Sequence, residues 1–357
     1  MTRTLLLIDD APILGGAELF CLRLASWLVR ERAETWQPAV VCPAGSALAE
    51  RCAAASIPVR AVPFPDLGLR GVPQMPAALL GLTAILRDAH RSGALVVATT
   101  ARAQAYAAVA RAAPGRIAPA VNLVLEQDTA ARPSARFVFR RVGRVVAIGE
   151  NTATTYRNAL PGVHVGRLNN FLDPRAFGAP RRRREPRAGA AAPTLGLLGR
   201  MIADKGILEL VEELARSPSC WGRLIVVGDE QDAQYAATVR ARISALGLGD
   251  RVTLRGYVSD IGPFLDEIDV LVVPSIGTEG QPTVIVEALA RAVPVIVRRP
   301  IWSSDFEGLS VLPYSDHLEL AEAIVRSQRS EAAPAGELER RFGPEQALDA
   351  LVTAGRR

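Results

Sequence analysis

Lys205 is the only lysine of the chain, since every other member of its 42 basic residues is an arginine. It follows Arg200 by five residues in the run GRMIADKG, between an apolar stretch (195–198) and a helix-like one (207–214). A compact ammonium on a strand-to-helix loop suits a phosphate group better than a rigid guanidinium fork does. We therefore interpret Arg200 and Lys205 as a candidate phosphate-binding pair, with an ordinary solvated lysine at a helix start as the alternative.

A second segment places two glutamates around a predicted helix start. An apolar strand ends at Pro274, a loop rich in glycine and proline follows, and a helix is expected from Thr283. Free N–H groups at such a helix start, together with the helix dipole, favour an anion. Glu279 lies in the loop, and Glu287 lies about one turn into the helix, where a carboxylate suits paired hydroxyls such as those of a ribose. Either glutamate alone is a weak signal, but their combination after an apolar strand is more specific.

These loops belong to a chain in which short apolar runs alternate with longer amphipathic ones. The helix expectations include 17–30 and 344–355. Strands are expected at 4–9, 37–42, 58–62, 95–99, 121–125 and 144–148, and again at 194–198, 224–228, 252–254, 270–274 and 293–297. Alternating strands and helices with buried apolar strands predict parallel sheets that are covered on both faces.

A chain of 357 residues is too long for one ordinary core, so two domains are expected. The segment 179–193 is rich in Pro, Gly and Arg without periodicity, and it is the predicted linker. It separates a domain at 1–178 from one at 194–335. A C-terminal helix is placed in 336–357, with its return to the N-terminal domain left open. Two doubly wound domains around a linker predict an interdomain cleft at the carboxyl ends of both sheets.

Composition narrows the function classes. The chain is 49% hydrophobic and 22% charged, which is typical of a soluble globular protein. Four cysteines without a Cys-x-x-Cys spacing and three scattered histidines give no support for a metal site, and a reducing cytoplasm is expected. Residues 1–178 carry 20 arginines against 12 acidic residues. This excess could face an anionic membrane surface or an anionic acceptor, or could reflect composition alone. An aromatic content of only 5% argues against nucleic acid.

The motifs together resemble those of the GT4-type retaining glycosyltransferases, also called glycosyl transferases group 1, which have the GT-B fold. Glu279 and Glu287 are separated by seven residues and are followed by EALA (287–290) and PVIV (294–297), as in the signature of that family. Four further runs are similar to family motifs: GGAE (15–18), NNFLDP (169–174), Gly199-Arg200 with Lys205-Gly206, and VVGD (226–229). The resemblance spans most of the chain and implies an α/β architecture of two Rossmann-like domains.

The resemblance also implies roles for individual residues. Arg200 and Lys205 would hold the donor diphosphate and neutralise the charge that grows on it. Glu287 would bind the ribose, and Glu279 the transferred sugar. The remaining donor contacts would come from the backbone and the base side: Gly15, Gly16, Gly280, Pro282, Thr283 and Val284 near the distal phosphate, and Tyr257 and Val258 beside the base. Such a site stabilises the leaving diphosphate with cationic and dipolar groups.

Two departures from the family pattern concern the reaction itself. Gln127 stands where family members often carry a histidine, and an amide cannot act as acid or base. Asp128 or Glu126 could substitute, or the reaction needs no such group. Arg298 opens a run, 298–302, where a Gly-Gly turn is common, which makes the local contacts to the donor sugar uncertain. The chain contains no Asp-x-Asp, which argues against a metal-dependent alternative.

The sequence thus predicts a retaining, metal-independent glycosyltransferase that uses a UDP- or GDP-sugar and needs no cofactor. Its acceptor would be an envelope polysaccharide or a lipid-linked glycan, and its place the cytoplasm, with peripheral association at the inner face of the membrane. Two alternatives are a sugar-nucleotide epimerase of the same architecture and a nucleotide-sugar-binding protein that has lost catalysis. A dinucleotide oxidoreductase is disfavoured, because no Gly-x-Gly-x-x-Gly opens either sheet.

Overall fold

The structure is a computed structural model, and it describes residues 2–10, 16–66, 71–125, 136, 138–140, 144–177, 192–277 and 279–356. The chain forms two compact units: unit 1 comprises residues 1–173 and 343–357, and unit 2 comprises residues 174–342. Most of the predicted linker falls outside the described residues, which resume at Ala192.

Unit 1 is built on a sheet of seven described strands, all parallel, in the order β3-β2-β1-β4-β5-β6-β7. The strands are β1 (Arg3–Ile8), β2 (Trp36–Cys42), β3 (Val59–Ala61), β4 (Leu95–Ala98), β5 (Ala120–Val124), β6 (Val145–Ile148) and β7 (Val165–Leu168). The chain order reverses between β1 and β4, which makes the carboxyl ends of these two strands a topological switch point.

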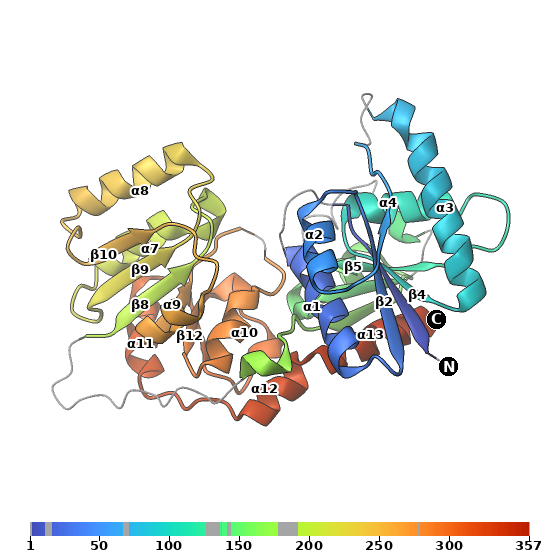
Figure 1. Cartoon of the computed structure of the whole chain (residues 1–357). Coiled ribbons are helices and arrows are strands. Elements are labelled where there is room, and N and C mark those ends of the chain that lie inside the picture. Colours follow the sequence, from blue (N-terminus) through green and yellow to red (C-terminus); the bar gives the residue numbers. More distant parts are fainter. Residues whose placement is uncertain are drawn as a thin grey trace. The chain divides into compact units, whose positions relative to one another are not determined.

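Helices cover both faces of this sheet (Figure 1). The helices are α1 (Gly16–Glu31), α2 (Ala47–Ala54), α3 (Met75–Ser92), α4 (Ala101–Ala110) and α6 (Gly149–Ala159). Side chains of β1 alternate between two cores: Leu5 and Leu7 pack with α1 and α2, whereas Leu6 and Ile8 pack with α3 and α4. This alternation follows from the two-residue period of a strand that is buried on both sides.

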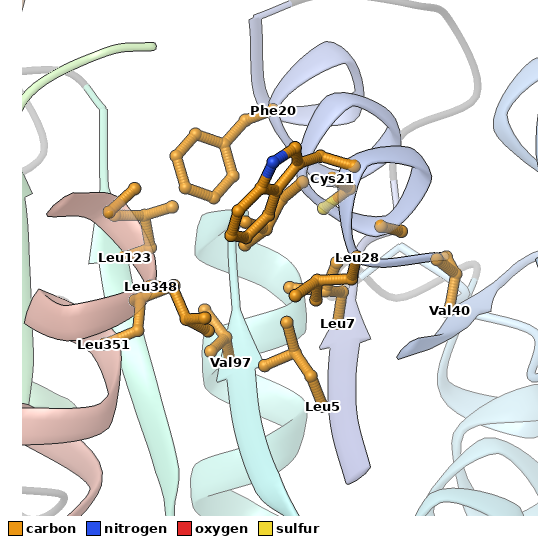
Figure 2. Packing of buried hydrophobic residues seen from close by; sticks show 14 of the residues in the cluster. Leu5, Leu7, Phe20, Cys21, Leu28, Val40, Val97, Leu123, Leu348 and Leu351 are labelled. Carbon is orange, nitrogen blue, oxygen red and sulfur yellow. The ribbon is translucent and has the colours of Figure 1, made fainter. Parts of the chain in front are cut away.

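The last helix of the described chain, α13 (Pro344–Arg356), belongs to unit 1. Leu348 and Leu351 of α13 lie in the same core as Leu123 and Val97 of the sheet, as Figure 2 shows. The helix predicted over 344–355 is confirmed as α13, but the segment 336–357 holds more than this helix: α12 (Ala335–Phe342) belongs to unit 2, and α13 begins at Pro344 in unit 1. Proline is well tolerated at the first turn of a helix but not inside one, so Pro344 favours this division.

Unit 2 contains a second parallel sheet, in the order β10-β9-β8-β11-β12-β13. Its strands are β8 (Thr194–Leu198), β9 (Arg223–Val227), β10 (Val252–Arg255), β11 (Val270–Val273), β12 (Val295–Arg298) and β13 (Val311–Tyr314). Its α-helices are α7 (Ile207–Ala215), α8 (Ala233–Ala245), α9 (Gly262–Glu267), α10 (Thr283–Ala290), α11 (His317–Ser327) and α12. The strand order is that of a Rossmann fold, with the switch point between β8 and β11.

The helices of unit 2 are fixed by packing against the sheet and by capping residues at their starts. Helices α7, α8 and α11 pack one face of the sheet with buried apolar residues of β8, β9 and β11. Asp232 caps α8 by accepting the N–H of Tyr235 at 3.0 Å, and Asp316 caps α11 by accepting from Leu318 and Glu319. Both caps satisfy helix-start donors that have no partner within the helix.

Candidate functional site

The site that the sequence predicts in unit 2 lies on two loops that leave neighbouring strands. The β8 loop (199–206) follows β8, and the β11 loop (274–282, Thr278 not described) follows β11. β8 and β11 are adjacent and parallel, so both loops start at the same edge of the sheet. This edge is the switch point of unit 2, where open α/β sheets bind their ligands.

The β8 loop passes close to the end of β9. Gly199 donates its N–H to Val227 at 2.9 Å, and Met201 donates to Asp229 at 2.8 Å. A Cβ on Gly228 would come within 1.8 Å of the Gly199 carbonyl oxygen, so only glycine fits between these two segments. The VVGD run (226–229) therefore packs against the backbone of the β8 loop and holds it in place.

The β8 loop ends where it crosses the β11 loop. Gly206 has a φ of +66° and starts α7, and a Cβ there would lie 2.2 Å from the carbonyl oxygen of Pro274. The carbonyl of Asp204 accepts the N–H groups of Ile276 and Gly277 at 2.9 and 3.1 Å. Three backbone contacts thus fix the two loops to each other.

Lys205 and Glu279 meet across this crossing. The Lys205 ammonium donates to Oε1 of Glu279 at 2.6 Å, with 24% of the lysine and 18% of the glutamate side chain exposed. The Lys205 Cδ lies 3.5 Å from the position that a Cβ would take on Gly199, so the lysine stem runs along a glycine. Two groups 74 residues apart in sequence therefore form one half-buried ion pair at the switch point.

Arg200 takes a different direction. It is exposed, and its Nη1 donates to the amide oxygen of Gln231 at 3.1 Å. The structure thus brings Lys205 together with Glu279, while the other predicted phosphate ligand contacts the segment after β9.

Helix α10 starts at Thr283, as the sequence predicts, and Pro282 precedes it as the N-cap residue. Glu287 is the fifth residue of this eight-residue helix and is half-buried, as are Thr283 and Val284 at its start. The first N–H groups of a helix have no intrahelical partner, so the start of α10 can receive an anion. Gly280 is half-buried in the loop directly before it.

Tyr257 and Val258 lie in the irregular segment that follows β10 and Gly256. Tyr257 is 74% exposed, and Val258 is half-buried. An exposed aromatic ring next to a parallel sheet edge provides a stacking surface for a planar base.

The predicted residues of unit 1 are only partly described. Gly16 is the first residue of α1, and a Cβ there would meet no atom within 4 Å. Gly15, Gln127 and Asp128 lie outside the described residues.

Sequence reasoning missed a polar cluster at the switch point of unit 1. Asp9 accepts the Thr99 hydroxyl at 2.6 Å, and Asp10 pairs with Nε of Arg102 at 3.0 Å. Asp9 is fully buried, and 5% of Asp10 is exposed. Two acids directly after an apolar strand were the signal that could have found this cluster, since buried carboxylates need partners.

Sequence reasoning also missed the role of Arg298 at the end of β12. Its Nε donates to the Pro274 carbonyl at 3.0 Å, and its Nη2 donates to both carboxylate oxygens of Glu213. Arg298, the first residue of the run that departs from the family pattern, thus contacts the β11 loop of its own unit. A charged side chain at the end of a buried strand was the available signal.

Two wider features frame the site. The described residues hold no group of three His, Cys, Asp or Glu side chains placed to bind a metal ion. None of the described helices combines the length and apolar character that crossing a bilayer requires.

Comparison with known proteins finds relatives of parts of the chain and of its fold. Residues 192–329 match the family model of glycosyl transferases group 1. The lipopolysaccharide core biosynthesis glycosyltransferase LpsE of Rhizobium meliloti (strain 1021) is 34% identical over 116 residues. That match covers 32% of this chain and 32% of LpsE, so it spans about a third of the curated relative.

Solved structures resemble the chain over nearly its whole length. Anabaena HepE in complex with UDP and glucose has a TM-score of 0.70 at 22% identity and covers 99% of this chain and 97% of its own. The lipopolysaccharide outer core galactosyltransferase WaaB in its apo form has a TM-score of 0.72 at 15% identity, with 99% of both chains covered. At such identities the likeness concerns the fold. The chain therefore has the GT-B fold, and its residues 192–329 resemble the glycosyl transferases group 1 family.

Proposed function

We propose that the chain is a glycosyltransferase that takes a sugar from a nucleotide-diphosphate donor. The observation that carries this proposal is the Lys205–Glu279 ion pair at the switch point of unit 2, beside the start of α10. A cation next to a helix start suits a diphosphate, and a neighbouring carboxylate suits sugar hydroxyls. The names of similar proteins support this choice, because LpsE is named as a glycosyltransferase and HepE was solved with UDP and with UDP-glucose.

In the proposed reaction, the bond between the anomeric carbon and the distal phosphate oxygen breaks, and the diphosphate keeps the electron pair. The acceptor oxygen bonds to the same face of the sugar, and the acceptor proton passes to the released diphosphate. Lys205 and the N–H groups at the start of α10 stabilise the growing negative charge. Arg200 is exposed and bonded to Gln231 in the structure, and it would add a second cation by turning to the diphosphate. These cationic and dipolar groups act without a divalent ion.

The remaining donor contacts are proposed from the resemblance to the family. Glu287 accepts hydroxyl groups of the ribose, Glu279 contacts the transferred sugar, and the Tyr257 ring lies against the base, which is that of UDP or GDP. Gly15 and Gly16 are proposed to contact the distal phosphate as well. Gln127 orients a hydroxyl of the donor sugar, with Asp128 as the alternative group at that position.

A screen of nucleotides tests the donor assignment. Unfolding of the protein is followed with UDP, GDP and their sugars, since a ligand at 100 times its Kd adds about 2.7 kcal/mol of stability. We expect one nucleotide family to stabilise the protein and its sugar to be turned over only with an acceptor, equally well in excess EDTA. Donor conversion without an acceptor would indicate an epimerase instead. Binding without any turnover would indicate a binding protein, and a rate that requires added Mn²⁺ would refute metal independence.

For the acceptor, we propose an envelope glycan or a lipid-linked glycan at the cytoplasmic face of a membrane. The support is the excess of arginine in residues 1–178 and the name of LpsE. Binding to vesicles with anionic lipid should fall as salt rises, because exposed charges are screened beyond about 8 Å at physiological ionic strength. Equal binding to neutral and anionic vesicles would refute the membrane part of the proposal and leave the donor part standing.

A further inference from the structure

Arg298 is a buried charge at the carboxyl end of β12. Only 15% of its side chain is exposed, and only 13% of that of its partner Glu213. A charge removed from water to this extent is stable only when it is paired and hydrogen-bonded. The contacts of Arg298 therefore decide which parts of unit 2 it fixes.

The guanidinium of Arg298 makes contacts in three directions. Nη2 donates to Oε1 and Oε2 of Glu213 at 3.0 and 3.1 Å. Nε donates to the carbonyl oxygen of Pro274 at 3.0 Å, and the guanidinium carbon lies 5.1 Å from the centre of the Tyr314 ring. The planar guanidinium bonds both carboxylate oxygens and the carbonyl in one fixed geometry, which the point charge of a lysine ammonium would not reproduce.

These contacts join the two loops of the candidate site. Glu213 belongs to α7, the helix that begins directly after Lys205 and Gly206. The Pro274 carbonyl is the group against which Gly206 packs, and it opens the loop that leads to Glu279. Arg298 thus contacts α7, which follows Lys205, and Pro274, which begins the loop that contains Glu279.

We propose that Arg298 is a positioning residue for the nucleotide-sugar site, which holds the β8 loop and the β11 loop at the spacing that lets Lys205 and Glu279 meet. Its charge is neutralised by Glu213, so it acts through these loops and does not contact the donor. The inference rests on the proposed function for its effect on the donor. Its effect on the ion pair is independent of that function.

Two pairs of arginine and glutamate make a matched test. Replacing both Arg298 and Glu213 by apolar residues of similar volume (Arg298→Met with Glu213→Leu) avoids an unpaired buried charge, which the single variants would leave. The neighbouring Arg299 pairs with Glu319 at 2.8 Å on the exposed side, with 56% and 43% of the side chains exposed. Arg299→Met with Glu319→Leu is therefore the control, with the same chemistry at the next position of the chain.

The single lysine of the chain provides a readout that needs no ligand. Labelling with ¹⁵N-lysine gives one side-chain ammonium signal, which reports on Lys205 alone. In the Arg298/Glu213 double variant we expect this signal to move toward its position in Glu279→Gln, and UDP or GDP affinity to fall at least tenfold, with the melting temperature near that of the wild type. The Arg299/Glu319 control should change none of these.

The proposal is overturned if the folded double variant keeps both the Lys205 signal and the nucleotide affinity of the wild type. If the double variant does not fold, Arg298→Lys serves instead, because it retains the charge and loses the fork. Wild-type affinity in Arg298→Lys would likewise refute the inference. If the wild-type protein binds no nucleotide, the proposed function is refuted. The Lys205 signal then still tests whether Arg298 positions the two loops.

Discussion

The glycine at position 206 gives the sharpest structural prediction. Gly206→Ala places a Cβ on a residue with φ of +66° and 2.2 Å from the Pro274 carbonyl oxygen. The left-handed conformation costs a non-glycine residue roughly 1–2 kcal/mol. The overlap with backbone adds roughly 1–3 kcal/mol, since the loops must separate by several tenths of an ångström or more. Together we expect a loss of about 2–5 kcal/mol in the free energy of unfolding of unit 2.

Gly247→Ala is the matched control for this prediction. Gly247 also lies in unit 2 and has a φ of +68°, but a Cβ there would meet no atom within 4 Å. It should therefore lose only the conformational part, about 1–2 kcal/mol. The difference between the two variants isolates the contact between the β8 loop and the β11 loop.

The assay is thermal and denaturant unfolding of both variants beside calorimetric titration with UDP and GDP. For a unit of this size we expect the melting temperature to fall by roughly 5–15 °C in Gly206→Ala and by a few degrees in Gly247→Ala. Nucleotide affinity should fall only in the first, because only there are the two loops forced apart. Equal losses of stability in both variants, with unchanged nucleotide affinity, would refute the reasoning about the crossing.

Three further predictions concern single groups. Lys205→Ala should lose roughly 2–4 kcal/mol of transition-state stabilisation, measured as turnover at saturating donor. Lys205→Arg should recover only part of this loss, because a guanidinium cannot take the same position as the ammonium. Wild-type turnover in Lys205→Ala would remove Lys205 from the mechanism. Glu287→Gln should weaken binding of the free nucleotide and of the donor alike by about 1.5–3 kcal/mol, because Glu287 accepts the ribose hydroxyls in both. Glu279→Gln should lower turnover and leave binding of the free nucleotide nearly unchanged, because Glu279 contacts only the transferred sugar; the opposite pattern in calorimetry would exchange the two roles. Burial raises the pKa of Cys52 to about 11, so the folded state holds this proton more tightly than the unfolded state does. The free energy of unfolding should therefore fall as the pH rises from about 9 toward 11. Urea unfolding should show a smaller fall in Cys52→Ala, and an equal fall in both proteins would contradict the assignment.

The interior strands could be predicted from the sequence because they are apolar on both faces. β8 has the predicted bounds, β2 and β4 differ from prediction by one residue at one end, and β1 lies one residue earlier than predicted at both ends. The two strands that sequence reasoning missed, β7 and β13, are edge strands with half-exposed positions, and β13 contains Pro313. An edge strand buries fewer side chains, so its pattern is weaker, and a proline lowers it further.

The loops of the candidate site could be predicted because glycine and proline interrupt the apolar runs there. The contact between Lys205 and Glu279 could not, because it depends on β8 lying beside β11 while β9 and β10 intervene in the sequence. The two roles assigned from the resemblance thus meet in one ion pair. Arg298 was interpreted only as a departure from a family turn, since its partners Glu213 and Pro274 are distant in sequence.

The return of α13 to unit 1 has a consequence for the order in which the protein matures on the ribosome. Unit 2 is complete once Phe342 has emerged, but the core of unit 1 still lacks Leu348 and Leu351 at that moment. Domains generally fold as they leave the ribosome, from the N-terminus onward. Most of unit 1 is translated first, but its core is completed only when α13 emerges after unit 2. A nascent chain stalled after Phe342 should therefore carry a protease-resistant unit 2 and a unit 1 that is still readily cleaved.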